Sequence, residues 1–226
     1  MTRNTRDEWA AQIAALEDAP PARKEPITVG RIVTTALALV EAEGFDALTM
    51  RRVAAALQTG PASLYAHVRN KAELDDLLIG ALSKNVVVPA PDPARWREQV
   101  LDVCAQLRDQ FLRYPGIARA ALAAPPANLN TLRITEGVLA ILLAGGVPPR
   151  KAAWAIDAAL LYVSAYTVES SLRGETDRGE MLARLKMLPP NRFPHTLEHV
   201  DEINAGEGHD RFEFAIGLLL DGLSAG

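Results

Sequence analysis

Residues 48–71 read LTMRRVAAALQTGPASLYAHVRNK, and this stretch carries the signals that decide the fold. Thr49 is a suitable N-cap for a short helix, and Pro61, just after Gly60, stands where a first-turn proline is tolerated in a helix expected to run to Val68. The spacing therefore predicts two short helices joined by a tight turn. Such a pair is typical of a helix-turn-helix unit, whose second helix enters the major groove of DNA.

The small and polar side chains of this stretch fit contacts with DNA. Pro61, Ala62 and Ser63 would open the second helix, and their small size permits a close approach to base edges. Tyr65 and His67 can donate hydrogen bonds to phosphates from the flank of that helix. Each residue taken singly is as readily an ordinary solvated group, but together they predict a DNA-binding site. Its candidate residues are Thr49, Arg51, Pro61, Ala62, Ser63, Tyr65, His67 and Lys71.

Helix signals flank the stretch on both sides. Thr28 is a plausible N-cap for a preceding helix, and Gly44 supplies the left-handed residue that ends it. Asn70 with Glu73 resembles a capping box and predicts the start of a following helix. We therefore expect residues 27–84 to form a compact helical DNA-binding domain.

The rest of the chain also reads as helical, so the predicted fold class is all-α. Residues 1–26 form an N-terminal extension with a short helix expected at 7–16, and residues 94–226 form a larger helical bundle. Residues 174–209, rich in Gly, Pro and charge, predict an irregular excursion with short helical pieces. In the larger domain the main helices are expected at 96–111, 129–144, 149–173 and 210–223.

Two of these helices carry more apolar surface than one core needs. The helix at 149–173 is apolar on more than one face, and the helix at 210–223 is strongly apolar. We expect both to pair with their copies in a second subunit, which makes a homodimer joined by a four-helix bundle. A dimer of this kind presents two recognition helices to a near-palindromic DNA site.

Composition narrows the class of protein. The single cysteine, Cys104, excludes an internal disulfide and is expected to be a small core residue. No signal peptide or membrane-spanning run is evident, which predicts a cytoplasmic protein with no membrane partner. The net charge is −4, yet residues 22–71 carry +3, so a mildly basic module is attached to an acidic body.

The recognition helix resembles that of the tetracycline-repressor family, which typically carries Leu-Tyr-x-His-Val/Phe-x-Asn-Lys, here residues 64–71. Looser similarity extends over 114–116, 145–147 and 212–223. One departure is Gln58, which stands in the turn where a glycine is usual. The resemblance implies a non-enzymatic transcription regulator without a cofactor: a homodimer that represses from its operator until a small-molecule effector binds the C-terminal domain.

The effector implied by the resemblance differs from tetracycline. Tetracycline repressors hold the drug's magnesium complex with histidines, and the matching positions here are Val87 and Ala120, which bind no metal. The sequence therefore predicts a largely apolar or aromatic effector and no metal site. The candidate lining residues of the effector pocket are Leu107, Phe111, Leu122, Leu139, Trp154, Tyr162 and Tyr166.

Two other classes of protein stay open at this point. His195, Glu198 and His199 match the H-x-x-E-H order of a zinc hydrolase, although a five-residue match is weak evidence. A helical dimerisation protein without an effector response is the second alternative. Met50 is left out of the DNA site because it could point into the small core instead.

Overall fold

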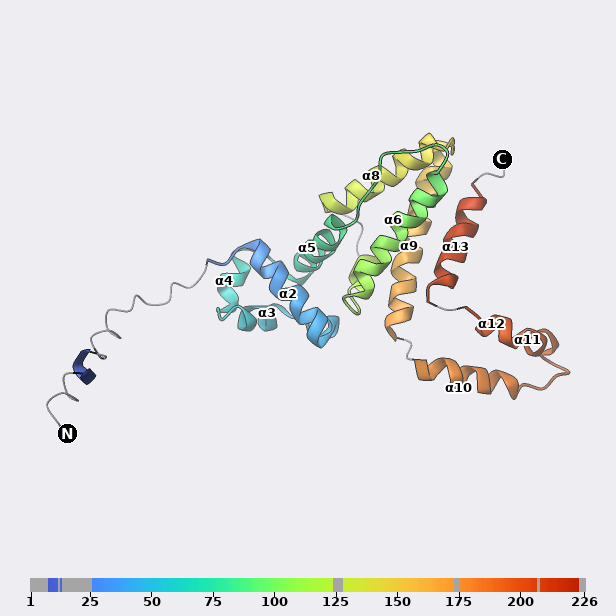
Figure 1. Ribbon diagram of the computed structural model, residues 1–226. Helices are drawn as coiled ribbons and strands as arrows, with labels where there is room; N and C mark the ends of the chain where they lie inside the picture. The colour runs from blue at the N-terminus through green and yellow to red at the C-terminus, as the bar shows by residue number, and fades with distance from the viewer. Residues whose placement is uncertain are drawn as a thin grey trace.

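The computed structural model describes residues 8–11, 13, 26–123, 128–172, 175–206 and 208–223. Every regular element in these ranges is a helix, so the predicted all-α fold is confirmed (Figure 1). None of the described helices has the length and hydropathy needed to cross a membrane. The elements are α2 (Val29–Glu43), a 3₁₀ turn (Phe45–Ala47), α3 (Met50–Ala56), α4 (Pro61–Tyr65), α5 (Lys71–Lys84), α6 (Trp96–Leu112), α7 (Ala118–Ala123), α8 (Leu129–Ala144), α9 (Pro149–Leu172), α10 (Glu175–Lys186), α11 (Pro194–Glu198), α12 (Val200–Asn204) and α13 (Asp210–Asp221).

Local capping builds the N-terminal unit as the sequence predicts. The side chains of Thr28, Thr49 and Asn70 accept hydrogen bonds from backbone N–H groups in the first turns of α2, α3 and α5. Gly44 ends α2 with a φ of 81°, which a residue with a side chain rarely adopts. Of the N-terminal extension, residues 8–11 and 13 are helical, and the rest lies outside the described residues.

The second helix of the helix-turn-helix is shorter than predicted. α4 ends at Tyr65 and not at Val68, because the N–H of His67 donates to the carbonyl of Leu64 over 3.0 Å in a tighter turn. The turn leaves Val68 fully buried. It also brings the chain out of α4 so that Asn70 can cap α5.

The turn between α3 and α4 contains a conformational strain that the sequence points to. Gln58 has a φ of 53°, the one positive value among non-glycine residues of the described chain. A left-handed conformation costs a residue with a Cβ about 1–2 kcal/mol. Glycine avoids this cost but loses more conformational entropy when the chain folds, so the net gain from a glycine is smaller. We expect Gln58→Gly to raise the free energy of unfolding by up to about 1 kcal/mol.

Chemical denaturation of Gln58→Gly and of Gln58→Ala, the matched control, measures this strain. Alanine keeps the Cβ, so that variant should be no more stable than the wild-type protein. Equal stability of the glycine and alanine variants would contradict a strained turn.

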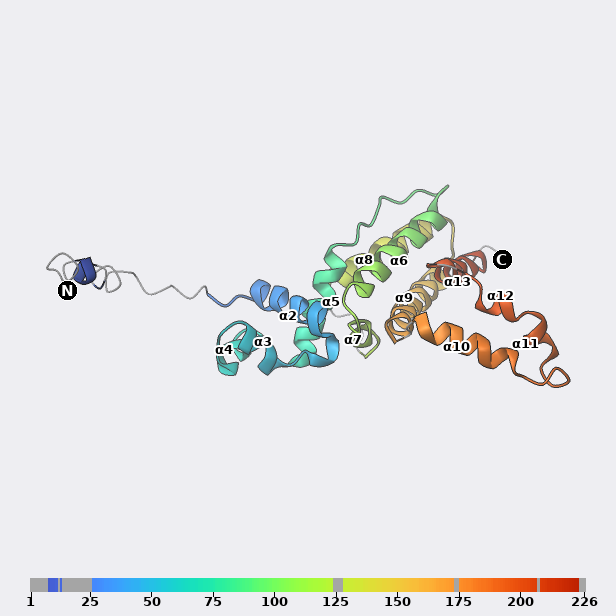
Figure 2. The same ribbon diagram turned by 60° about the horizontal axis from the view of Figure 1, so that its bottom comes forward.

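Helix α5 joins the N-terminal unit to the body. It packs on α2 at one end and on α6, α7 and α8 along its length (Figures 1 and 2). The guanidinium of Arg133 on α8 donates to the carbonyls of Ser83 and Val86 over 2.9 and 2.8 Å. These bonds satisfy carbonyls at the C-terminal end of α5, so that end is fixed to the body.

Helix α9 is the centre of the body, since it packs against α6, α7, α8 and α13. Its buried residues follow one face, along Ala152, Ile156, Ala159 and Val163, whereas Trp154 and Leu161 on the other side are exposed. The second apolar face that the sequence predicts is therefore left uncovered by the described residues. Within the expected irregular excursion the chain forms α10, which is 12 residues long, and two helical turns, α11 and α12. Figure 2 shows these three helices projecting from the body beside α13.

Candidate DNA-binding face and effector cavity

The candidate DNA-binding residues gather on α3, α4 and the start of α5. Most of their side chains are exposed, namely those of Thr49, Arg51, Pro61, Ala62, Ser63 and His67. Tyr65 has half of its surface exposed. Helices α3 and α4 lie at the opposite end of the molecule from α13 (Figure 1). Met50, by contrast, is buried in the core of the unit.

Two adjacent arginines on α3 have different surroundings. Arg52 binds Glu43 of α2 through an ion pair, with its Nε 3.1 Å from the carboxylate, and this guanidinium lowers the pKa of Glu43. Arg51 is exposed and forms no ion pair with any of the described residues. Arg52 therefore ties α3 to α2, whereas the charge of Arg51 is available to a phosphate.

Lys71 connects the DNA-binding face with the body. Its ammonium lies 4.1 Å from the centroid of the Phe45 ring and pairs with Asp75 one turn further along α5. Burial raises the pKa of Asp75, although the hydrogen bond and charge of Lys71 act against that shift. Asp75 also lines a cavity in the C-terminal body, so the Lys71–Asp75 pair links the DNA-binding face to that cavity.

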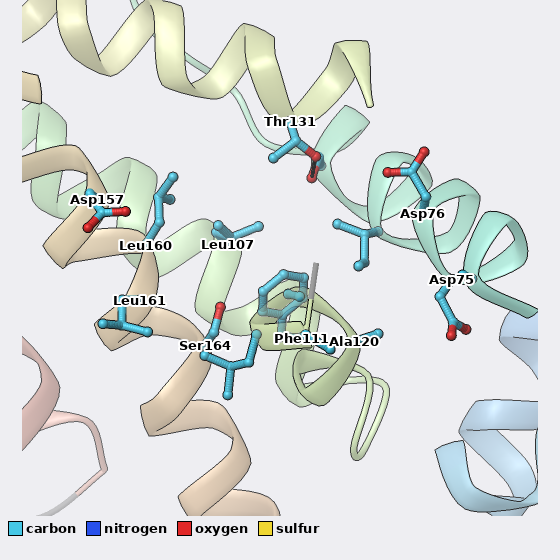
Figure 3. Close-up of a pocket in the computed structure, with 16 residues that line it drawn as sticks. Asp75, Asp76, Leu107, Phe111, Ala120, Thr131, Asp157, Leu160, Leu161 and Ser164 are labelled. Atoms are coloured by element: carbon cyan, nitrogen blue, oxygen red, sulfur yellow. Dashed lines mark hydrogen bonds between the residues drawn. The ribbon is translucent and has the colours of Figure 1, made fainter. Parts of the chain in front are cut away.

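A cavity of about 610 Å³ lies where α5, α6, α7, α8 and α9 meet (Figure 3). That volume is within the range of small-molecule binding sites. Its wall is mostly apolar, with carboxylates and hydroxyls between the apolar groups. The lining residues are Ala72, Asp75, Asp76, Ile79, Ser83, Leu107, Phe111, Ala120, Ala121, Leu122, Ala123, Thr131, Asp157, Leu160, Leu161 and Ser164.

The predicted pocket residues separate into two groups. Leu107, Phe111 and Leu122 line this cavity. Tyr162 and Tyr166 do not, because they face α13, where their ring centroids lie 5.8 and 5.1 Å from that of Phe212. The other two also lie outside the lining: Trp154 is 66% exposed, and Leu139 packs against the core.

Sequence reasoning missed the contribution of α5 to the cavity. Asp75, Asp76, Ile79 and Ser83 are not among the pocket residues that the sequence predicts, although two adjacent carboxylates beside an apolar stripe were a usable signal. The face of α9 that carries Asp157, Leu160 and Ser164 could not be chosen from the sequence, because apolar residues occur on every side of that helix.

Of the two positions matched to the metal-binding histidines of tetracycline repressors, one lies in the cavity and the other outside it. Ala120 lines the cavity, whereas Val87 is 67% exposed and lies outside the lining. The backbone of Val87 exchanges two hydrogen bonds with the side chain of Gln106, which attaches the segment after α5 to α6.

The residues of the alternative zinc motif form an open surface. The side chains of His195 and His199 are 89% and 56% exposed, and each has a ring nitrogen 3.8 Å from Glu198. In the part of the chain that the structure describes, no group of three His, Cys, Asp or Glu side chains could hold a metal ion. Cys104 is buried, and burial raises the pKa of its thiol to about 12, so it is not a reactive nucleophile.

Comparisons with known proteins agree with this architecture. Residues 32–75 match the family of bacterial regulatory proteins of the tetR family, and residues 88–226 match the tetracyclin repressor-like C-terminal domain. The HTH-type transcriptional repressor DrrR1 of Streptomyces coeruleorubidus is 29% identical, over 88% of this chain and 78% of its own length. The class G tetracycline repressor of Vibrio anguillarum is 27% identical, over 87% of this chain and 91% of its own.

Solved structures give the same family. Apo ActR from Streptomyces coelicolor superimposes with a TM-score of 0.84 at 39% identity, covering 89% of this chain and 97% of its own. ActR in complex with actinorhodin gives a TM-score of 0.83 at 38% identity, covering 89% of this chain and 98% of its own. Because the C-terminal match alone spans more than half of the sequence, the chain belongs to the TetR family of DNA-binding transcriptional regulators.

Proposed function

We propose that this protein is a cytoplasmic, homodimeric repressor that leaves a near-palindromic operator when a small molecule occupies the α5–α9 cavity. The observation that carries the proposal is the position of α5. Its first residue, Lys71, belongs to the DNA-binding face, and Asp75, Asp76, Ile79 and Ser83 of the same helix line the cavity. An effector that repositions α5 would thereby move the recognition helices out of register with the two half-sites.

On DNA, α4 enters the major groove with Pro61, Ala62 and Ser63 at base edges. Tyr65, His67 and Lys71 contact phosphates of one strand, and Thr49 and Arg51 contact the other. The exposure of these side chains supports this assignment, except for Lys71, which is half-buried and paired with Asp75. The protein acts by binding, with no catalytic role for the His195 motif.

The surface of α9 and α13 supports the proposed dimer. Leu161 on α9 and Phe214 and Leu218 on α13 are 58%, 68% and 57% exposed, although each is a large apolar side chain. The two helices pack on each other, so these side chains belong to neighbouring elements. A second copy of the same face would cover them in a four-helix bundle.

The effector is largely apolar and contains rings. Leu107, Phe111 and Leu160 give the cavity an apolar wall, which favours a ligand that gains by leaving water, at about 25 cal/mol per Å² of buried apolar area. ActR, at 38% identity, is known in complex with actinorhodin, which supports a small-molecule effector for this cavity.

A selection from random DNA duplexes, followed by release of the enriched duplex, tests the proposed function. We expect an inverted repeat whose half-sites lie about one helical turn, or a multiple of it, apart. Some compounds in a panel of apolar ring compounds should release the protein from the enriched duplex. Failure to enrich any sequence would remove the repressor assignment and favour the helical dimerisation protein.

Magnesium-tetracycline should neither bind this protein appreciably nor release its operator. No histidine is among the cavity's lining residues, and the carboxylates there form no group that could hold a metal ion within the described chain. The histidine donors by which tetracycline repressors hold the drug's magnesium complex are therefore missing from this cavity. Calorimetric titration with and without Mg²⁺ measures this, and micromolar, magnesium-dependent binding would contradict it.

A further inference from the structure

We propose that the cavity selects an effector with a positively charged nitrogen attached to its apolar ring system, and that Asp76 and Asp157 are the residues that select that charge. This inference rests on the proposed function, since it takes the cavity as the effector site. It adds the chemical class of the ligand, a cationic amphipathic ring compound.

The cavity is acidic at two separate places. Asp76 on α5 and Asp157 on α9 lie on opposite sides of it, with Leu107, Phe111 and Leu160 between them (Figure 3). None of its lining residues is a lysine, arginine or histidine. A bound ring system would therefore have a carboxylate near either end and no protein cation beside it.

These two carboxylates are without partners, in contrast to Asp75. Asp75 is paired with Lys71, so its charge is already balanced. Asp76 is half-buried and Asp157 is exposed, and neither has an ion pair or hydrogen bond with any other described residue. An anionic ligand would be repelled by both carboxylates and a cationic one attracted, more strongly by Asp76 than by Asp157, because solvent screens an exposed charge.

A third side chain indicates that the cavity is made for a ligand with polar groups. Ser164 on α9 is only 6% exposed, and its hydroxyl is directed into the cavity (Figure 3). This hydroxyl has no hydrogen-bond partner among the described residues and is accessible from the cavity. A ligand hydroxyl or carbonyl placed against Ser164 would form a hydrogen bond with it.

Two dyes with the same xanthene ring system and opposite charge test the charge preference. Rhodamine 123 is a cation and fluorescein an anion, and fluorescence anisotropy of each can be followed on titration with the full-length protein. We expect rhodamine 123 to bind roughly tenfold more tightly, the difference that one charge-assisted contact provides. Asp76→Asn and Asp157→Asn should each reduce that ratio severalfold, because rhodamine 123 loses an attractive charge and fluorescein loses a repulsive one.

Glu136→Gln is the matched control, because Glu136 is an exposed carboxylate of α8 outside the cavity's lining. This variant should keep the wild-type ratio of the two affinities. Ser164→Ala removes the hydroxyl without changing charge and should weaken both dyes about equally. Absence of rhodamine 123 binding, equal binding of the two dyes, or a ratio that Asp76→Asn and Asp157→Asn leave unchanged would overturn the proposal.

Operator binding, measured on the same preparations without dye, distinguishes failure of the cationic-effector proposal from failure of the proposed repressor function. Protein that binds its selected operator but shows no charge preference overturns only the cationic effector. Protein that enriches no DNA sequence overturns the proposed function, whatever the dyes do.

Discussion

Leu218→Glu should convert the protein from dimers to monomers and reduce its operator affinity by two to four orders of magnitude. Leu218 is an exposed apolar side chain of α13, and α13 packs on α9, whose Leu161 is also exposed. In a dimer, the glutamate would be buried without a partner at a cost of several kcal/mol. The loss of DNA affinity follows because a monomer engages one half-site only, and a linked second half-site contributes a factor on the order of 10²–10⁴.

Light scattering of the variant gives its oligomeric state, and titration with the selected operator gives its affinity. Leu218 is a better position for the charge than its neighbour Leu219. Leu219 packs partly against the core of the body, so a glutamate there would also destabilise the monomer.

Leu129→Glu controls for the introduction of a charge as such. Leu129 is 82% exposed at the start of α8 and is not part of α9 or α13, so this variant should remain a dimer with normal operator affinity. A dimer of Leu218→Glu that persists at micromolar concentration would show that the subunits meet elsewhere.

The DNA-binding unit could be predicted from the sequence because its signals are local. Thr28, Thr49 and Asn70 each cap a helix whose first turn follows directly, and Gly44 and Gln58 occupy the left-handed positions of turns. Such interactions link residues a few positions apart, so a linear sequence contains both partners. Only the end of α4 was misplaced, because burial of Val68 and the cap of α5 decide where that helix stops.

The cavity could be predicted only in part, because it depends on which face of each helix meets which neighbour. On α6 a single apolar stripe fixes that face, and Leu107 and Phe111 lie where the sequence placed them, on the lining. On α9 apolar residues lie all round, so the sequence favoured its aromatic residues. Tyr162 and Tyr166 pack instead on α13, which follows a segment of the chain that no local pattern positions.

Tyr65→Ala and Lys71→Ala should each weaken DNA binding roughly tenfold, on the operator and on scrambled duplex alike. Both side chains are assigned to phosphates, which position the protein without reading bases. The two variants should differ in their response to salt. Lys71→Ala removes a cation, so the slope of log affinity against log salt should fall by about one unit, whereas Tyr65→Ala should leave that slope unchanged.

Lys84→Ala is the matched control for Lys71→Ala, because Lys84 is an exposed lysine at the opposite end of the same helix. It should change neither the affinity nor the salt slope. Asp75→Asn provides a further check: without its partner carboxylate, the ammonium of Lys71 is released to a phosphate, and affinity for any duplex should rise. Normal affinity in both Tyr65→Ala and Lys71→Ala would show that α4 and the start of α5 do not face the DNA backbone.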